Sequence, residues 1–192
     1  MKAGLIILGI VAVIGLWIMS KYNGLVPKDN KVKKEWANVQ NDYQRRLDLI
    51  PNLVSTVKGA ANFEQKTLTD VIEARAKATQ MNVNAGDLSP EKIKEFQAAQ
   101  GQLSQAMGRL MMVTENYPTL QANKNFLDLQ VQLEGTENRI TASRKDYNLA
   151  VEEFNNAVRT FPTNLVASFT NMKEKPTFEA DAAAQKAPTV QF

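Results

Sequence analysis

The hydrophobic and polar positions divide the chain into one uniformly apolar segment and a long region of periodic patterns. Ala3–Met19 carries no charged residue and has no polar face. A helix of this length spans about 26 Å, close to the roughly 30 Å hydrocarbon core of a bilayer. The pattern predicts a transmembrane anchor over residues 1–22, with the apolar side chains Leu5, Ile6, Ile7, Leu8, Ile10, Val11, Val13, Ile14, Leu16, Trp17 and Ile18.

A cleaved signal peptide is the alternative explanation for this segment. The apolar region of a signal peptide usually has about 7–15 residues and ends in small side chains. A cut after Ser20 would instead place Ile18 at a position that needs a small residue. We therefore expect an uncleaved anchor, with Trp17 and Tyr22 at the membrane interface.

Basic residues flank the apolar segment unequally. Lys2 and the amino terminus precede it, whereas five lysines follow it. The positive-inside rule counts such residues close to a span, so it predicts the N-terminus outside and the body in the cytoplasm. The five are Lys21, Lys28, Lys31, Lys33 and Lys34.

Helical periodicity dominates the rest of the chain. Gly24 and Pro27 predict a hinge over residues 23–28, because proline removes a donor and clashes within a helix. Seven-residue apolar repeats follow, and Pro51 inside the first of them predicts a kink or a restart there. The expected helices span about residues 29–80, 90–115, 119–161 and 163–174, and residues 176–192 form an extended or mobile tail.

These patterns predict an all-α fold: an N-terminal transmembrane helix followed by an antiparallel bundle of three long helices and one short one, over residues 29–175. The third long pattern has a large residue at every seventh position without a slip. The expected bundle core is Trp36, Tyr43, Ile50, Leu53, Val57, Phe96, Leu103, Leu110, Phe126, Leu133, Ile140, Tyr147, Phe154 and Phe161.

The unequal lengths of the expected helices constrain how they pack. As straight helices, the three long segments would measure about 78, 39 and 65 Å. The third would extend beyond a shared layer, so either the first helix breaks at Pro51 or another copy covers the exposed apolar positions. We therefore expect self-association into a homo-oligomer.

Composition excludes several kinds of site. The chain has no cysteine and no histidine, so it lacks a thiolate nucleophile, the usual general base and the commonest metal ligand. The net charge is only +3 and no basic stripe follows a helix, which argues against nucleic-acid binding. We predict no catalytic, cofactor-binding or metal-binding residue. The alternative is a carboxylate-only site for a divalent metal, drawn from Glu64, Glu73, Glu115, Glu134 and Glu137.

Several polar residues have two interpretations. Arg46 interrupts the apolar repeat, and we expect a solvated side chain whose stem covers the seam, although a charge pair at the proline break is the alternative. Glu73 and Arg75 are expected to be solvated, because residues two apart do not face each other on a helix. Thr136 lies in the seam, where a polar contact is a device for setting register. The apolar tail residues Phe178, Val190 and Phe192 would dock on the bundle or add to a partner as an extended strand.

A set of motifs through the whole chain resembles the LemA family of bacterial membrane proteins. The resemblance implies one membrane span, a helical bundle and no known enzymatic activity, in the bacterial plasma membrane, with membrane proteases among the candidate partners. The matching segments are YNGLV from Tyr22, RRLDLIPNLVSTVKGAANFE from Arg45, EARAKA from Glu73, NYPTLQANKNFLDLQ from Asn116, LEGTENRITASRKDYN from Leu133, FNNAVRTFP from Phe154, and the closing residues Pro188 to Phe192.

We therefore expect a non-catalytic, membrane-anchored scaffold or adaptor whose bundle binds further copies or other membrane proteins. The unbroken repeats and the missing catalytic set favour this function. A carboxylate-only metal protein or enzyme is one alternative. A signalling transducer that relays change across the hinge at Gly24 and Pro27 is another, although almost nothing of the chain would lie outside to sense a ligand.

Overall fold

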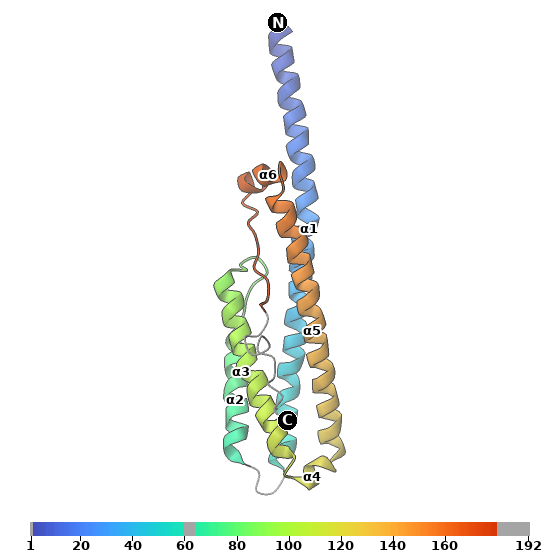
Figure 1. The fold of residues 1–192 in the computed structure, drawn as a ribbon, viewed down its shortest axis with the longest axis vertical. Coiled ribbons are helices and arrows are strands. Elements are labelled where there is room, and N and C mark those ends of the chain that lie inside the picture. The colour runs from blue at the N-terminus through green and yellow to red at the C-terminus, as the bar shows by residue number, and fades with distance from the viewer. Residues whose placement is uncertain (1, 60–63, 180–192) are drawn as a thin grey trace, which may run out of the picture.

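The computed structural model describes residues 2–59 and 64–179, and within these residues every regular element is a helix (Figure 1). The expected all-α class is therefore confirmed. The helices are α1 (Lys2–Lys58), α2 (Gln65–Gln80), α3 (Pro90–Thr114), α4 (Pro118–Gln121), α5 (Lys124–Arg159) and α6 (Thr163–Phe169).

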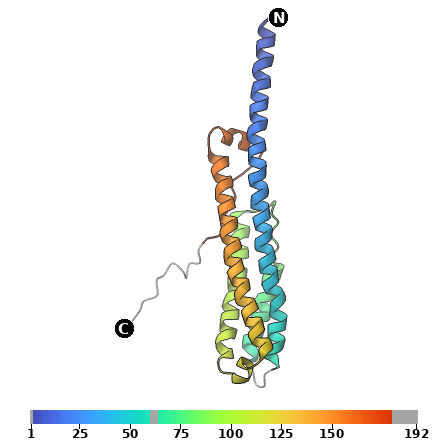
Figure 2. The same cartoon turned by 90° about the vertical axis from the view of Figure 1, so that its right-hand side faces the viewer.

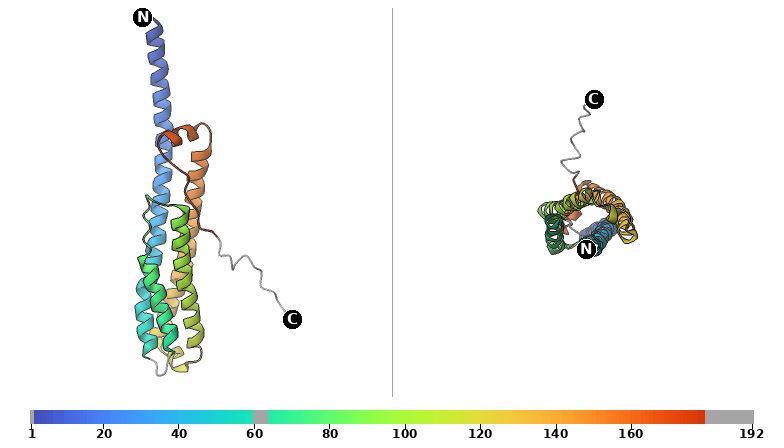
Figure 3. Two further views of the ribbon diagram at one scale, coloured as in Figure 1. Left: turned by 90° about the vertical axis from the view of Figure 1, so that its left-hand side faces the viewer. Right: turned by 90° about the horizontal axis from the view of Figure 1, so that it is seen from below.

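The four long helices run alternately down and up around a common core. α1 and α5 lie antiparallel along the full length of α5, and the α2–α3 hairpin covers the lower part of this pair (Figures 1 and 2). Seen from below, the helices surround one axis (Figure 3). α4 connects α3 to α5 at the lower end, and α6 packs on α1 and α5 at the upper end.

The N-terminal part of α1 projects alone beyond the bundle. An 18-residue window here has a mean hydropathy of 2.5, and none of it is buried. By length and composition, this segment is able to cross a membrane. Residues 2–20 are all exposed, including each of the eleven apolar side chains expected in the anchor.

The predicted hinge over residues 23–28 is wrong, because α1 is continuous from Lys2 to Lys58 with Pro27 inside it. The expected helix over 29–80 is wrong in its end as well: α1 stops at Lys58, and α2 turns back from Gln65. A proline costs a helix about 3 kcal/mol. The packing of α1 against α5 and α6 on both sides of Pro27 supplies the stabilisation that local sequence does not show.

Pro51 is also inside α1, and the structure replaces the hydrogen bond that it removes. A proline at 51 leaves the carbonyl of Leu47 without its helical donor. The Nε of Arg75, from α2, donates to that carbonyl at 2.9 Å. Arg75, expected to be solvated, therefore caps an orphaned carbonyl in a neighbouring helix, and α1 continues through the proline.

The apolar core has an upper and a lower cluster. The upper cluster includes Trp36, Phe96 and Phe154, and the lower one includes Leu53, Leu103 and Leu133. Of the fourteen expected core residues, thirteen are at most 5% exposed. The exception is Phe161, which is 74% exposed because α5 ends at Arg159 and the chain turns outward before α6.

The upper half of α5 extends beyond α3, as the helix lengths predicted, but this chain covers it. The continuous α1 packs along it, α6 closes its end, and residues 172–179 run down beside it (Figure 3). The short helix thus ends at Phe169 instead of residue 174. The unequal helix lengths therefore no longer give a reason to expect self-association. Residues 176–179 of the expected tail are docked; residues 180–192, with Val190 and Phe192, lie outside the described residues.

Candidate functional site

Residues 172–179, here called the strap, run in an extended conformation along α5. Side chains of α5 hold them by hydrogen bonds to their backbone N–H and C=O groups. Asn148 accepts from the amide of Phe178 at 2.9 Å and donates to its carbonyl at 3.1 Å. Asn155 does the same for Lys175, at 2.9 and 2.8 Å. Tyr147 donates to the carbonyl of Pro176 at 2.9 Å.

The spacing of the two asparagines fits an extended peptide. Asn148 and Asn155 are two turns apart on α5, which is about 10 Å along the helix axis. Lys175 and Phe178 are three residues apart, and an extended chain covers about 10 Å over three residues. The strap runs antiparallel to α5, so one helix face presents two amide side chains in register with two main-chain units. Such contacts specify an extended backbone more than they specify side chains.

Phe178 is the apolar anchor of the strap and is 6% exposed. Its ring stacks on Trp36 with centroids 5.9 Å apart and meets Tyr147 edge-on at 5.4 Å. Phe96 completes the aromatic cluster at 6.5 Å. The guanidinium of Arg144 lies 4.8 Å from the ring centroid, in cation–π geometry. Docking of Phe178 on the bundle, one of the two expectations, is therefore what the structure shows.

Charged and polar contacts hold the strap at Lys175 and at Glu179. Lys175 Nζ lies 2.8 Å from Asp29 on α1, with both side chains largely buried. Burial alone would raise the pKa of Asp29, but hydrogen bonds from Lys175 and Lys33 lower it below its usual value. At the other end, Gln97 and Arg144 donate to the carbonyl of Glu179 at 2.8 and 3.1 Å. The strap therefore ties together α1, α3 and α5.

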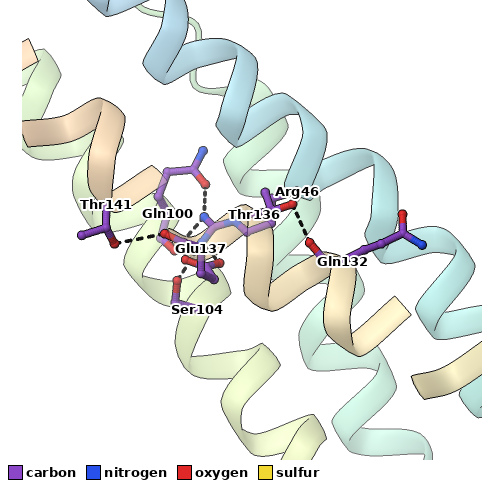
Figure 4. Close-up of polar contacts among 7 residues, drawn as sticks. All are labelled: Arg46, Gln100, Ser104, Gln132, Thr136, Glu137 and Thr141. Carbon is purple, nitrogen blue, oxygen red and sulfur yellow. Dashed lines mark hydrogen bonds and ion pairs between the residues drawn. The ribbon is translucent and has the colours of Figure 1, made fainter. Parts of the chain in front are cut away.

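A second polar constellation separates the two apolar clusters (Figure 4). Arg46 is 2% exposed. Its Nη1 donates to Ser104 Oγ and Glu137 Oε1, each at 2.8 Å, and its Nη2 bonds the side chain and carbonyl of Gln100. The guanidinium also lies 5.0 Å from the Tyr43 ring centroid. We call Arg46, Gln100, Ser104 and Glu137 the polar layer, and it joins α1, α3 and α5.

The expectation that Arg46 is solvated is wrong, because α3 and α5 enclose it. Its repeat position points the side chain inward, and α3 and α5 supply acceptors there. Thr136 sits beside the layer with no exposed surface. Its hydroxyl donates to the carbonyl of Gln132 at 2.7 Å and accepts from Arg139 at 2.9 Å. Both of these hydrogen bonds stay within α5, so the register hypothesis for Thr136 remains a prediction.

The candidate metal ligands lie apart from one another. Glu64, Glu73, Glu115, Glu134 and Glu137 are all exposed, and Glu137 pairs with Arg46. Over residues 2–59 and 64–179, no three acidic side chains come close enough to hold a metal ion. The burial of Tyr147 raises the pKa of its hydroxyl well above the usual range, so this phenol acts as a hydrogen-bond donor to Pro176 at neutral pH.

Four of the five lysines after the apolar segment form ion pairs in the bundle. Lys28 and Lys31 bracket Glu153 at 2.5 and 2.8 Å, and Lys33 lies 2.6 Å from Asp29. Lys34 is 3.8 Å from Glu35. The hydrogen bonds from Lys28 and Lys31 lower the pKa of Glu153 to about 2. Lys28 and Lys31 therefore join α1 to α5 in addition to flanking the apolar segment, whereas the pairs of Lys33 and Lys34 lie within α1.

Sequence reasoning missed the residues that hold the strap. A signal is present: Asn148 and Asn155 directly follow Tyr147 and Phe154, so an amide repeats with the seven-residue period beside the apolar column. Asn and Gln at exposed helix positions are common, however, and only the path of the strap gives these two a shared partner. Gln100 was missed because polar residues at apolar repeat positions have no visible partner in sequence.

Comparison with known proteins places these features in a family. The chain is 27% identical to the protein LemA of Metamycoplasma hominis, over 84% of this chain and 70% of that protein. It is 28% identical to the magnetosome protein MamQ 2 of Paramagnetospirillum magneticum and 26% identical to the MamQ protein of Magnetospirillum gryphiswaldense, in both cases over 92% of this chain and 71% of the relative. The sequence model of the LemA family matches residues 35–192, which include most of the bundle and the whole strap. This chain therefore belongs to the LemA family.

Proposed function

We propose that this protein is a non-catalytic, membrane-anchored scaffold whose bundle binds membrane-associated partner proteins or further copies of itself. The continuity of α1 is the observation that carries the proposal. One helix from Lys2 to Lys58 contains both the apolar projection and the first helix of the bundle core. A partner bound anywhere on the bundle would thus be held close to the membrane.

The bundle is suited to a binding role because its own residues fill its interior and leave apolar side chains on its surface. Two apolar clusters, the polar layer and the strap fill it, and its described surface carries apolar side chains that the core does not use. Ile72, Met112, Val131 and Leu149 are each more than half exposed. Two of the relatives are named as magnetosome proteins. The family resemblance described above makes membrane proteases the first candidate class of partner.

We propose further that the bundle faces the cytoplasm of a bacterial plasma membrane. The support is the five lysines that follow the apolar segment. The positive-inside rule depends on basic residues near the span and little on acidic ones, so the ion pairs of these lysines do not cancel their effect.

The alternative functions find less support. A carboxylate-only metal site would need acidic residues that converge, and the five candidate glutamates are exposed and separate. A transducer working through a hinge at Gly24 and Pro27 would need a break that α1 does not have. Movement could still pass along α1 as a rigid body, but the span would then have to move the whole bundle.

Membrane anchoring is tested by substitution within the apolar segment. Leu8→Arg combined with Val11→Arg should release the protein from membranes washed with alkaline carbonate, because each central arginine costs about 2.5–3.5 kcal/mol on insertion. Val131→Arg, on the exposed face of α5, is the matched control and should stay in the membrane pellet. Retention of the double variant in the pellet would contradict anchoring by this segment.

Binding is tested by crosslinking in intact membranes. Photoreactive residues at the exposed positions 72, 131 and 149 should give reproducible crosslinks, identified by mass spectrometry as another copy or a membrane protein. The same residue at the buried position 103 is the control and should give none. An absence of crosslinks at all three exposed positions, in cells grown under several conditions, would rule against a scaffold.

A further inference from the structure

The short helix α6 is apolar on two opposite faces. Its inner face buries Val166 and Ala167, each 2% exposed, against α1 and α5. On its outer face, Leu165 and Phe169 are four residues apart and therefore adjacent. Phe169 is 89% exposed and Leu165 is 49% exposed; Phe161, in the turn that leads into α6, is 74% exposed. We call these three side chains the α6 patch.

A patch of this kind is unusual on a surface that contacts only water. Single exposed apolar residues are common, but grouped large ones mark contact with a protein or a membrane. The bundle core has no need of these three residues, because α6 already packs through Val166 and Ala167. Two phenylalanines flanking a short helix therefore need a second apolar environment.

The position of α6 along α1 identifies that environment. The uncharged segment ends at Met19, and Lys21 is the first residue of α1 that the bundle partly covers. Leu25, in the same apolar cluster as Ala167, is 1% exposed. Figures 1 and 2 show α6 at the end of the bundle nearest the projecting helix. From Lys21 to Leu25 the helix rises about 6 Å, comparable with the headgroup layer, which adds about 5–7 Å on each side of the hydrocarbon core.

We propose that the α6 patch inserts into the interface of the leaflet from which α1 emerges, and so forms a second contact with lipid. This inference rests on the proposed membrane anchoring by α1. Aromatic side chains favour the interfacial region, and a short element lying in its plane needs only its outer face to be apolar. Lys21, the first charged residue after the apolar segment, would then lie near the lipid phosphates.

The second contact would limit the tilt of the bundle. A single span leaves a rigid body free to tilt and to rotate about the span axis. Contact at α6, displaced to one side of α1, limits this tilt (Figure 3). Each surface of the bundle would then stay at a fixed distance from the membrane, which suits a scaffold.

The test uses the full chain, which has no cysteine, so a single introduced cysteine can carry an environment-sensitive fluorophore. Thr170→Cys places the label beside Phe169 while retaining the patch. Val13→Cys reports on the span, and Glu115→Cys, exposed at the far end of the bundle, is the negative control. The labelled proteins are reconstituted into phosphatidylcholine–phosphatidylglycerol vesicles that contain lipids with nitroxide groups either near the headgroup, to quench a label at position 170, or deep in the acyl chains, to quench a label at position 13.

We expect quenching of the labels at positions 13 and 170 and none at position 115. Adding Phe161→Ser and Phe169→Ser should lower quenching at position 170 by at least half, whereas Met112→Ser, which removes one exposed apolar side chain at the far end, should leave it unchanged. The helical circular dichroism of each variant shows whether it remains folded.

The outcomes separate this inference from the proposed function. Quenching at position 13 without quenching at position 170 would overturn the second contact and leave the anchor in place; shielding by another copy would give this result. Loss of quenching at position 13 would overturn both. Quenching at position 170 that the two serine substitutions do not change would show that the patch is not responsible, and would overturn the inference.

Discussion

Single polar residues inside the bundle make contacts that connect helices far apart in sequence. Arg46 is a fully enclosed cation with three partners from two other helices, and only one of these partners, Glu137, is charged. Buried ion pairs contribute little net stability but are costly to break from one side, since the remaining groups stay desolvated. Such groups also disfavour other registers, because a shift of α1 would place the guanidinium in an apolar layer.

Substitution of Arg46 by methionine should destabilise the protein by about 1–3 kcal/mol, because the buried side chain of Gln100 loses its partner. Adding Gln100→Met should recover most of that loss, since an apolar pair of similar volume replaces the polar one. Urea unfolding in detergent, followed by circular dichroism, measures both. Additive losses in the double variant would show that Arg46 and Gln100 are not coupled.

Arg75 and Pro51 form a second coupled pair. Arg75→Ala should cost about 1–2 kcal/mol, because the part-buried carbonyl of Leu47 loses its donor. In a Pro51→Ala background, the new amide at position 51 can donate to that carbonyl, so Arg75→Ala should cost much less. Thermal unfolding of the four proteins of the cycle gives the coupling free energy. A coupling near zero would mean that Arg75 contributes by packing alone.

At the scale of elements, the strap takes the place of a helix. α2 and α3 are shorter than α5, so the upper part of the bundle has only two long helices. The strap covers the gap with one buried ring and paired contacts to the main chain. Tail and bundle are therefore one cooperative structure over the residues described.

The strap should depend on the amide groups of α5. Asn148→Leu keeps the volume of the side chain but removes both contacts to Phe178, and we expect hydrogen exchange at residues 175–179 to accelerate at least tenfold. Exchange in α2 should stay unchanged. Asn156→Leu, one position after Asn155 and exposed, is the matched control. Equal exchange in Asn148→Leu and the unsubstituted protein would show that the two contacts of Asn148 are not needed to hold the strap.

At the scale of the whole molecule, carboxylates join the upper helices and the strap. Glu153 accepts from two lysines of α1, and Asp29 contacts Lys175 of the strap. The pKa of Glu153 is lowered to about 2, and that of Asp29 is lowered as well. A lowered folded pKa means that the stabilisation is present above the unfolded value, near 4, and is lost as pH falls toward the folded value.

We therefore expect the melting temperature to be constant from pH 7 to about 5 and to fall between about pH 4 and 2. In the variant with Glu153→Gln and Asp29→Asn, the melting temperature should be lower at pH 7 and should change less in the acidic range. Calorimetry across this range measures both curves. Parallel curves for the two proteins would assign the acid sensitivity to other carboxylates.

Local periodicity in the sequence was enough to predict the helical class, the apolar projection and nearly all of the core. Trp36, Ile50 and Tyr147 lie on seven-residue repeats, and repeats of apolar residues leave few choices of buried face. The N-cap at Ser89 likewise depends on neighbours in sequence, and its hydroxyl accepts from the amide of Lys92.

Contacts between residues distant in sequence set where α1 ends, which groups bond the Arg46 guanidinium and where the strap lies. Pro27 and Pro51 read as breaks, yet packing against α5 and α6 and the donor from Arg75 keep α1 continuous. Asn148 and Arg46 look solvated until residues distant in sequence supply their partners. A polar side chain is satisfied by whatever the fold brings to it, and its own sequence neighbourhood does not contain that information.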